Sequence, residues 1–246
     1  MAYLRLRNNI QAWRDIGANN EVLSWIEKGV KIDFSSNPVS YEHANRANSQ
    51  KDIDFIDSEL KKLYNNGAIS KVEQKPFCVN ALFTTPKKND KLRLVTDLHP
   101  LNVHVITPYF KNDGIDTVCE LIKPNDLMLT VDLKDGFHHV GIHPDFRQFL
   151  GFQWRGQYYV WNVCPFGLSS SPYYFNKLIR AVVTYLRSES LRVNFWVDDG
   201  LLMEAPDEAE NSKVTFMSKL EILGIYVNFD ESELELSESK LYVIYY

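Results

Sequence analysis

Three aspartates at the ends of apolar runs are the residues of this sequence best suited to chemistry. An apolar run from Leu127 to Val131 ends on Asp132, and a second run, Val193 to Val197, precedes Asp198 and Asp199. Apolar residues resume two positions later, so the pattern predicts short strands with a tight turn at the paired acids. Strands that deliver carboxylates to one edge of a sheet could bind two hard cations such as Mg²⁺, with substrate phosphates as further ligands. The alternative is an ordinary Asp-Gly turn with no metal.

The composition narrows the class of protein. The chain has 246 residues, of which 45% are apolar and 13% aromatic, which is typical of a globular protein with a sizeable core. No apolar run reaches membrane-spanning length and no secretory signal is recognisable, so we expect an intracellular protein, in the cytoplasm or the nucleus, without a membrane partner. Three scattered cysteines without CxxC spacing favour a reducing compartment, and the six histidines form no zinc pattern.

The charge is unevenly distributed along the chain. The net charge of −5 argues mildly against a nucleic-acid partner. Residues 1–100 nevertheless carry 15 Lys and Arg against 12 Asp and Glu, whereas residues 201–246 carry 3 against 10. A basic stretch at 87–93 stands out locally, so the global charge is a poor guide to partners.

The elements that must position the acids are a mixture of helices and strands. Ser49 and Asp52 resemble a capping box, which predicts the start of a helix that ends near Gly67. Hairpins are predicted at 79–95 and 149–163, and Ser171 is expected to cap a helix that begins at Pro172. A last helix over 207–223 is predicted to bury Val214, Met217, Leu220 and Leu223, with strands at 226–229 and 241–246. The pattern indicates an α+β fold.

The ordered motifs resemble the core of retroelement reverse transcriptases. They are Pro86-Lys87-Lys88, then Leu92 to Asn102, then Val131 to Phe137, Cys164 to Pro172, Trp196 to Asp199, and Leu223 to Phe229. The resemblance covers about residues 50–246. Residues 26–34, 132–138 and 182–187 look like the DIRS-type retrotransposon lineage, and gypsy-type elements are the nearest alternative.

This resemblance implies a polymerase fingers-palm architecture, with an antiparallel palm sheet packed on helices. It implies an N-terminal extension and linker at 1–48, fingers at 49–105 and 141–169, and palm at 106–140 and 170–246. The chain stops near the start of the primer-grip hairpin, so we expect a fragment or degenerate copy whose thumb is missing.

The resemblance also implies an RNA-directed DNA polymerase with two-metal catalysis. Asp132, Asp198 and Asp199 match the catalytic, metal-binding carboxylates, and the backbone of Leu133 lies in the same motif. Two Mg²⁺ are implied, with Mn²⁺ as a substitute, and the partners are an RNA or DNA template-primer and dNTPs. The oligomeric state is left open.

Further positions match nucleotide and nucleic-acid contacts. The implied nucleotide-binding residues are Lys87, Lys88, Arg93, Asp135, Gly136, Phe137, Phe166 and Gly167. Within this set Phe137 matches the steric gate against a 2′-hydroxyl, and Arg93 matches the triphosphate clamp. The implied primer-template residues are Asp97, Asn102, Pro165 and Trp196.

Two departures from the family pattern bear on activity. Trp196 stands where tyrosine is usual, and Glu231 stands where a lysine is thought to protonate the leaving pyrophosphate. A non-catalytic descendant that binds nucleic acid or protein is therefore the second hypothesis. An unrelated metal-dependent phosphatase or nuclease is the third, although it does not explain Pro165 to Pro172 or the basic hairpin.

Overall fold

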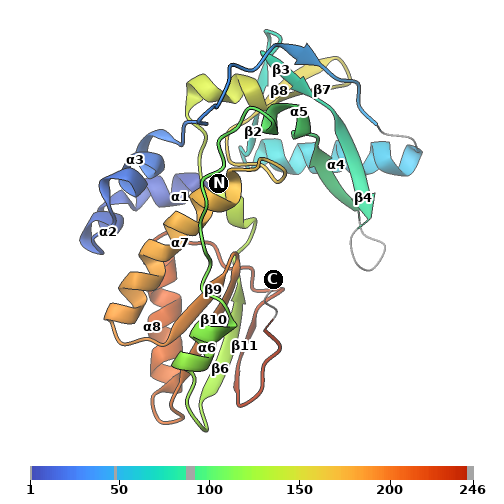
Figure 1. Cartoon of the computed structure of the whole chain (residues 1–246). Helices are drawn as coiled ribbons and strands as arrows, with labels where there is room; N and C mark the ends of the chain where they lie inside the picture. The colour runs from blue at the N-terminus through green and yellow to red at the C-terminus, as the bar shows by residue number, and fades with distance from the viewer. Residues whose placement is uncertain (1, 47–48, 87–91, 243–246) are drawn as a thin grey trace. The chain divides into compact units, whose positions relative to one another are not determined.

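The computed structural model describes residues 2–46, 49–86 and 92–242. The chain divides into two compact units, each assembled from separate stretches of sequence (Figure 1). The first unit comprises Lys28–Pro108 and Val140–Ser171. The second comprises Ala2–Glu27, Tyr109–His139 and Pro172–Tyr246. The α+β fold class predicted from the sequence is confirmed.

The first unit is built around a five-stranded sheet in the order β1-β3-β7-β8-β2. Its strands are β1 (Tyr41–Glu42), β2 (Ile69–Val72), β3 (Cys78–Asn80), β7 (Gly151–Trp154) and β8 (Gln157–Trp161). The β3 strand pairs in parallel with both β1 and β7, and β7 and β8 form the predicted hairpin. A 3₁₀ segment, η3 (Pro144–Leu150), leads into β7.

A helix and a second hairpin complete this unit. The helix α4 (Gln50–Asn65) has the predicted capping box, in which Ser49 Oγ accepts from the amide of Asp52. Its apolar side buries Ile56, Leu60 and Leu63. The hairpin pairs β4 (Leu82–Pro86) with β5 (Leu92–Thr96), and the short helix α5 (His99–Asn102) follows.

The hairpin expected at 79–95 is confirmed from Leu82 onward, but its first strand is wrong at 79–80, because the run at 79–85 is divided between two sheets. Asn80 ends β3, and its buried amide donates to the carbonyl oxygens of Phe149 and Gly151 at 3.2 and 2.8 Å. Tyr41 donates from its hydroxyl to Asn80 Oδ1 at 2.5 Å. These bonds fix the side chain of Asn80 in the five-stranded sheet, and the chain leaves that sheet at Ala81 before β4 begins.

The second unit contains a four-stranded antiparallel sheet in the order β11-β6-β10-β9. The strands are β6 (Leu127–Asp132), β9 (Val193–Trp196), β10 (Asp199–Glu204) and β11 (Glu233–Ser237). The helices are α1 (Ala2–Asn8), α2 (Ile10–Asp15), α3 (Asn20–Lys28), α6 (Ile115–Leu121), α7 (Ser171–Ser188) and α8 (Ala209–Ile222), with a 3₁₀ segment η2 (Gly136–His139).

Helices cover the two faces of this sheet. On one face, Phe195 of β9 contacts Phe216 of α8 with ring centroids 6.2 Å apart. On the other face, Val118 of α6 packs in a buried cluster with Leu201 and Met203 of β10. Side chains alternate between the two faces along each strand, and most residues of β6 and β10 on both faces are apolar and buried. This explains why the acidic motifs are embedded in near-continuous apolar runs.

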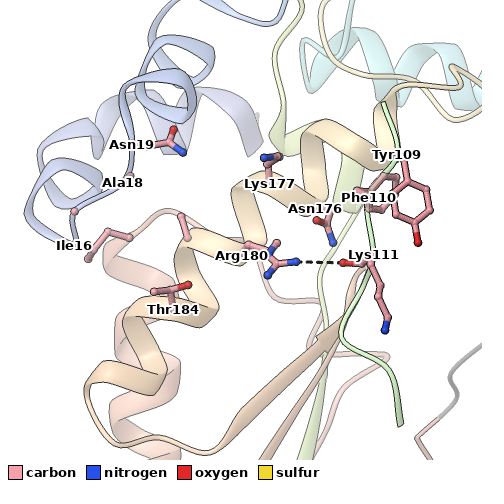
Figure 2. A pocket seen from close by; sticks show the side chains of 12 residues that line it. Ile16, Ala18, Asn19, Tyr109, Phe110, Lys111, Asn176, Lys177, Arg180 and Thr184 are labelled. Atoms are coloured by element: carbon pink, nitrogen blue, oxygen red, sulfur yellow. Dashed lines mark hydrogen bonds between the residues drawn. The ribbon is translucent and has the colours of Figure 1, made fainter. Parts of the chain in front are cut away.

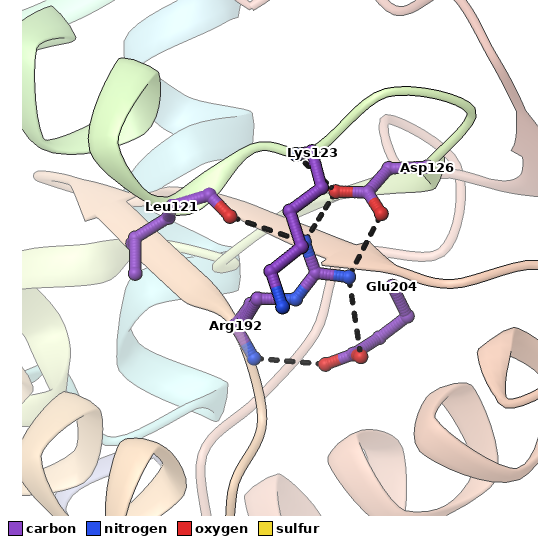
Figure 3. Close-up of polar contacts among 5 residues, drawn as sticks. All are labelled: Leu121, Lys123, Asp126, Arg192 and Glu204. Atoms are coloured by element: carbon purple, nitrogen blue, oxygen red, sulfur yellow. Dashed lines mark hydrogen bonds and ion pairs between the residues drawn. The ribbon is translucent and has the colours of Figure 1, made fainter.

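A buried ionic network holds one end of the sheet (Figure 3). The guanidinium of Arg192 binds Asp126 through both terminal nitrogens, and its Nη2 lies 3.7 Å from Glu204 Oε2. Glu204 Oε1 also accepts from the amide of Arg192 at 2.8 Å, and Lys123 donates its amide to Asp126. Both carboxylates are buried. The loop before β6 is thus attached to the start of β9 and the end of β10.

Three other expectations need correction. Val214 of α8 is 67% exposed, and Phe216 takes the buried position against the sheet. Residues 226–229 form only an isolated bridge from Val227 to Leu133, and β11 begins at Glu233. Ser171 starts α7 and donates to the carbonyl oxygen of Pro165 at 3.0 Å, so its hydroxyl binds the preceding loop. The strand expected at 241–246 falls largely outside the described residues.

No helix among the described residues is both long and apolar enough to cross a lipid bilayer.

Candidate active site

Two of the three aspartates lie directly opposite each other on neighbouring strands. Asp132, the last residue of β6, pairs in register with Asp199, the first residue of β10. Residues paired in this way direct their side chains to the same face, with Cβ atoms about 4.5–5.5 Å apart. Like charges in this arrangement repel each other, so the pair is unfavourable unless something between the carboxylates neutralises them.

Asp198 lies in the turn that joins β9 to β10. The pairing of Trp196 with Asp199 leaves a two-residue loop, Val197 and Asp198, so the turn lies one residue earlier than the turn expected at Asp198 and Asp199. Val197 has φ of +58°, a conformation that glycine favours at the first position of a two-residue hairpin loop and that strains a β-branched residue. The carbonyl oxygen of Asp198 accepts from the amide of Leu133 at 2.9 Å, which connects the turn to the end of β6.

The acids affect one another's ionisation. Burial, followed by the negative charges of Asp198, Asp132 and Glu231, raises the pKa of Asp199 from its ordinary value to about 6. Glu231 therefore contributes negative charge to this site. Such a concentration of negative charge in a partly buried place is the donor chemistry that a hard divalent cation neutralises.

The protein carboxylates alone would provide only some of the ligands that a metal ion needs, and substrate would provide the rest. Among the described residues, no three His, Cys, Asp or Glu side chains form a preassembled metal-binding group. A few protein carboxylates completed by substrate phosphates are the usual arrangement for Mg²⁺, so the set of oxygen donors suits this ion. Asp132, Asp198, Asp199 and the backbone of Leu133 are the groups that would hold it.

A polar turn that sequence reasoning missed holds Asp132 in place. Asn228 donates from Nδ2 to Asp132 Oδ1 at 2.9 Å and from its backbone amide to the Asp132 carbonyl oxygen at 2.8 Å. Ser232 Oγ accepts from the Asp132 amide at 2.9 Å and donates to the Asn228 carbonyl oxygen at 2.7 Å. One carboxylate oxygen and both backbone groups of Asp132 are thereby fixed. Asn228 lay inside a recognised motif, but only the structure shows its partner.

A second support acts on the opposite strand. Tyr242 donates from its hydroxyl to the carbonyl oxygen of Asp199 at 3.0 Å and accepts from Asn194 Nδ2 at 3.2 Å. Tyr242 also packs against the apolar cluster beneath α6. The backbone of Asp199 is therefore held from the sheet face that carries its side chain.

The segment after β6 approaches Asp198 closely. A Cβ built on Gly136 would lie 3.1 Å from Asp198 Cβ and 3.3 Å from the Phe175 ring, so glycine allows this contact. Asp135, with φ of +53°, turns the chain into η2. Phe137 is half-buried, and its ring meets Phe175 edge-on at 5.7 Å. Gly136 therefore lies beside Asp198 within the second unit, and Asp135 and Phe137 are its neighbours in the chain.

His139 anchors this segment in its neutral form. The backbone amide of Tyr226 donates to Nε2 at 2.9 Å, so the ring proton is on Nδ1, which donates to the Gly136 carbonyl oxygen at 2.9 Å. Burial lowers the pKa of His139 to about 4. The fixed tautomer holds Gly136, and through it the approach to Asp198.

The remaining expected site residues that the structure describes belong to the first unit, except Trp196, which pairs with Asp199. Arg93 is exposed on β5, and Lys87 and Lys88 lie outside the described residues. Asp97 forms an ion pair with Arg46 at 2.5 Å. Asn102 donates to the Gly167 carbonyl oxygen at 2.8 Å and accepts from the Ser169 amide at 3.0 Å.

The loop held by Asn102 contains three of the expected residues. Pro165 is buried, and Phe166 is 43% exposed. Gly167 has φ of +100°, and a Cβ there would lie 3.2 Å from the Thr96 carbonyl oxygen. Both observations account for glycine at this position.

Comparisons with known proteins agree with this arrangement. The family described as "Reverse transcriptase (RNA-dependent DNA polymerase)" matches residues 85–242. The Tf2-3 transposon polyprotein of Schizosaccharomyces pombe is 24% identical over 180 residues, which cover 72% of this chain. Those residues are 13% of the polyprotein, so the chain spans a small part of this relative.

Solved structures show the same fold. A crystal structure of the protease-reverse transcriptase of prototype foamy virus has a TM-score of 0.70 at 24% identity, over 83% of this chain and 27% of that one. A foamy viral protease-reverse transcriptase in complex with an RNA/DNA hybrid has a TM-score of 0.68 at 19% identity, over 93% of this chain and 33% of that one. The likeness supports the fingers-palm architecture.

Proposed function

Because this chain belongs to the reverse transcriptase (RNA-dependent DNA polymerase) family, we propose that it adds deoxynucleotides to a primer 3′-hydroxyl on an RNA or DNA template. The observation that carries the proposal is the end of the palm-like sheet, where Asp132 and Asp199 face each other and Asp198 lies in the adjoining turn. Two bound Mg²⁺, for which Mn²⁺ can substitute, would supply activation of the 3′-hydroxyl and charge neutralisation of the pyrophosphate.

The chain's own groups would orient the reactants. Asp132 is fixed by Asn228 and Ser232, so its second carboxylate oxygen has a defined direction. The backbone carbonyl oxygen of Asp198 accepts from the Leu133 amide, which fixes the turn that carries this side chain. Ligands that are already oriented pay little reorganisation free energy when substrate binds. Glu231 would oppose the developing charge on pyrophosphate, and we expect it to slow the reaction.

We assign the incoming nucleotide to the residues that the family pattern indicates. Arg93, with Lys87 or Lys88, would bind the triphosphate, and the backbone amides of Asp135 and Gly136 would add donors. Phe166 and Gly167 would pack against the nucleotide, and Asp97, Asn102, Pro165 and Trp196 would contact the primer or template. The first unit would then act as fingers and the second as palm.

Template-primer is the proposed macromolecular partner. A foamy viral relative of the same fold was solved with an RNA/DNA hybrid. Among lineages we favour the DIRS type, on residues 26–34 and 182–187, with the gypsy type as the alternative. Because dNTPs and template RNA are intracellular, we propose an intracellular site of action.

The steric gate is tested by Phe137→Val. A smaller side chain leaves room for a 2′-hydroxyl, so incorporation of ribonucleotides should rise at least about tenfold relative to deoxynucleotides, which corresponds to about 1.4 kcal/mol. Single-nucleotide extension with each substrate measures this ratio. An unchanged ratio would assign Phe137 to the core, where it already contacts Phe175.

The function itself is tested by primer extension on an RNA template with Mg²⁺. The full chain should extend the primer, and Asp198→Asn should lower the rate at least about 100-fold, since a metal ligand contributes several kcal/mol to the transition state. Asp116→Asn, the same change at an exposed position of α6, is the matched control and should retain the rate. A parent chain as inactive as Asp198→Asn would identify a non-catalytic protein with this fold.

A further inference from the structure

A basic groove lies in the second unit, and none of the residues that line it is an aspartate (Figure 2). It has a volume of about 400 Å³ and is formed by three segments: the turn at 16–19, residues 109–111, and the middle of α7. Its cations are Lys111, Lys177 and Arg180. The turn at 16–19, between α2 and α3, precedes the region that the family model matches. One side of the groove is therefore formed by residues outside that region.

The three cations of the groove are not neutralised. The lining contains no Asp or Glu. Arg180 donates to the carbonyl oxygen of Lys111 at 3.2 Å, and Lys177 Nζ lies 5.7 Å from the centre of the Tyr173 ring. Within the described part of the chain, none of the three forms an ion pair, whereas Arg187 on the same helix pairs with Asp113 at 2.9 Å. The groove is therefore locally positive on a chain whose net charge is −5.

The groove also presents an aromatic ring to solvent. Tyr109 is 91% exposed. Its neighbour Phe110 contacts Tyr173 of α7 with ring centroids 6.2 Å apart, which holds the segment against the helix. Tyr109 and Lys111 flank this anchor. An exposed ring beside unpaired cations is the combination that binds single-stranded nucleic acid, by base stacking and phosphate contacts.

We propose that this groove binds a single polynucleotide strand through its phosphates, with one base stacked on Tyr109. The inference rests on the proposed function only in taking nucleic acid as the partner. Phosphates match the three cations, and a base matches the ring, whereas an acidic peptide would leave Tyr109 without a role. Contacts of this kind are independent of sequence, as a polymerase requires.

The test measures binding of fluorescein-labelled 12-nucleotide oligo(dT) and oligo(rA) to the full chain by anisotropy, over a range of salt. The groove variant combines Lys111→Ala, Lys177→Ala and Arg180→Ala. The control variant combines Lys51→Ala, Lys61→Ala and Lys62→Ala, which removes the same charge from exposed positions of α4. Thermal melting identifies any variant that fails to fold, and single Lys177→Gln and Arg180→Gln variants then replace the triple.

The groove variant should bind about 100-fold more weakly near 0.1 M salt, and the slope of log K against log salt should fall by about 2, as expected for three lost phosphate contacts. The control should change both much less. Tyr109→Ala should cost about tenfold in affinity without changing the slope, since stacking carries no charge.

Several results would overturn the proposal. One is an equal loss of oligonucleotide affinity in the groove and control variants. Another is displacement of the labelled oligonucleotide by an acidic peptide but not by unlabelled oligonucleotide. A third is its displacement by free ATP or pyrophosphate at concentrations where unlabelled oligonucleotide has no effect. Asp198→Asn should bind the oligonucleotides as the parent does. If the parent chain binds oligonucleotide through the groove but does not extend a primer, the proposed function alone is contradicted. If it extends a primer but the groove substitutions leave oligonucleotide affinity unchanged, this inference alone is contradicted.

Discussion

At the scale of single residues, neutral polar side chains hold the aspartates of the candidate active site in position. Asn228 and Ser232 bind Asp132, and Tyr242 binds the backbone of Asp199. Such partners normally orient metal ligands and maintain their basicity. Their contribution should therefore appear in cation affinity before it appears in stability.

Asn228→Ala removes the donor to Asp132 Oδ1. We expect Mn²⁺ binding to weaken about 10- to 100-fold, because the carboxylate loses its fixed orientation. Electron paramagnetic resonance titration of the full chain with Mn²⁺ measures this without requiring activity. Asn176→Ala, which removes a half-buried amide on α7, is the control and should retain the affinity. Equal affinities for Asn228→Ala and the parent would show that the amide serves only the fold.

His139 gives a pH dependence of stability whose sign follows from its burial. The unfolded imidazole takes up a proton below its ordinary pKa of about 6.5, whereas the folded one resists until about 4. The unfolded state binds more protons in this window, so the stabilisation is complete above pH 6.5 and is lost as the pH falls toward 4. Its size is about 3 kcal/mol.

The measurement compares urea unfolding of the parent and His139→Gln between pH 4 and pH 7.5. The free-energy difference between them should shrink by about 3 kcal/mol toward pH 4. Asp199, whose pKa is raised to about 6, acts in the opposite direction below pH 6 but is common to both chains. Parallel pH profiles would contradict the assignment of a neutral, hydrogen-bonded His139.

The sequence located the three aspartates but not the residues that support them. An acid at the end of an apolar run is a local signal, and pairing of β6 with β10 follows from it. The bond from Asn228 to Asp132 spans 96 residues, and that from Tyr242 to Asp199 spans 43. Contacts at such separations are set by tertiary packing, which a local pattern does not contain.

At the scale of elements, the sheet of the second unit is held by the network around Arg192. Arg192→Met would leave Asp126 and Glu204 charged, with side chains only 3% and 5% exposed. We expect a loss of about 3–5 kcal/mol, because unpaired buried charges are costly. Chemical denaturation at pH 7 measures it.

Two further variants make the Arg192 prediction specific. Adding Asp126→Leu and Glu204→Met to Arg192→Met should recover most of the loss, since apolar groups then replace the whole network. Arg14→Ala removes one member of an exposed ion pair with Glu27 and should cost less than about 1 kcal/mol. Similar losses for Arg192→Met and Arg14→Ala would show that the network contributes no more than a surface pair.

Elements with strong local signals were predicted well, and those decided by neighbours were not. The capping box of α4 and the hairpin of β7 and β8 formed as expected. The apolar run at 79–85 was divided because Asn80 bonds to one sheet while the chain passes to another. Val214 was expected on the buried side of α8, but Phe216 lies there instead and contacts the ring of Phe195.

At the scale of the whole molecule, the N-terminal helices are part of the second unit although the family pattern begins at residue 85. Leu6 and Trp13 are completely buried, and Trp13 Nε1 donates to the Leu223 carbonyl oxygen at 2.9 Å. These helices therefore stabilise the unit that carries the aspartates.

A chain lacking residues 2–27 should melt at least about 10 °C below the parent, because it loses a buried tryptophan and the packing around it. Trp13→Ala should by itself cost about 3–5 kcal/mol. Arg7→Ala, at an exposed position of α1, is the control and should melt with the parent. Calorimetry measures all three, and an unchanged melting temperature on deletion would show that the segment is dispensable for the fold.

The order of the segments has a consequence for synthesis on the ribosome. The first unit has its last segment once residue 171 is made, whereas the second begins at residue 2 and still lacks β9, β10, α8 and β11. Leu223, whose carbonyl oxygen accepts from Trp13, is synthesised 210 residues after Trp13. This takes roughly 10–40 s at translation rates of about 5–20 residues per second. For that interval the apolar surface of α1 and α2 is unprotected, and we expect chaperones to bind the nascent chain.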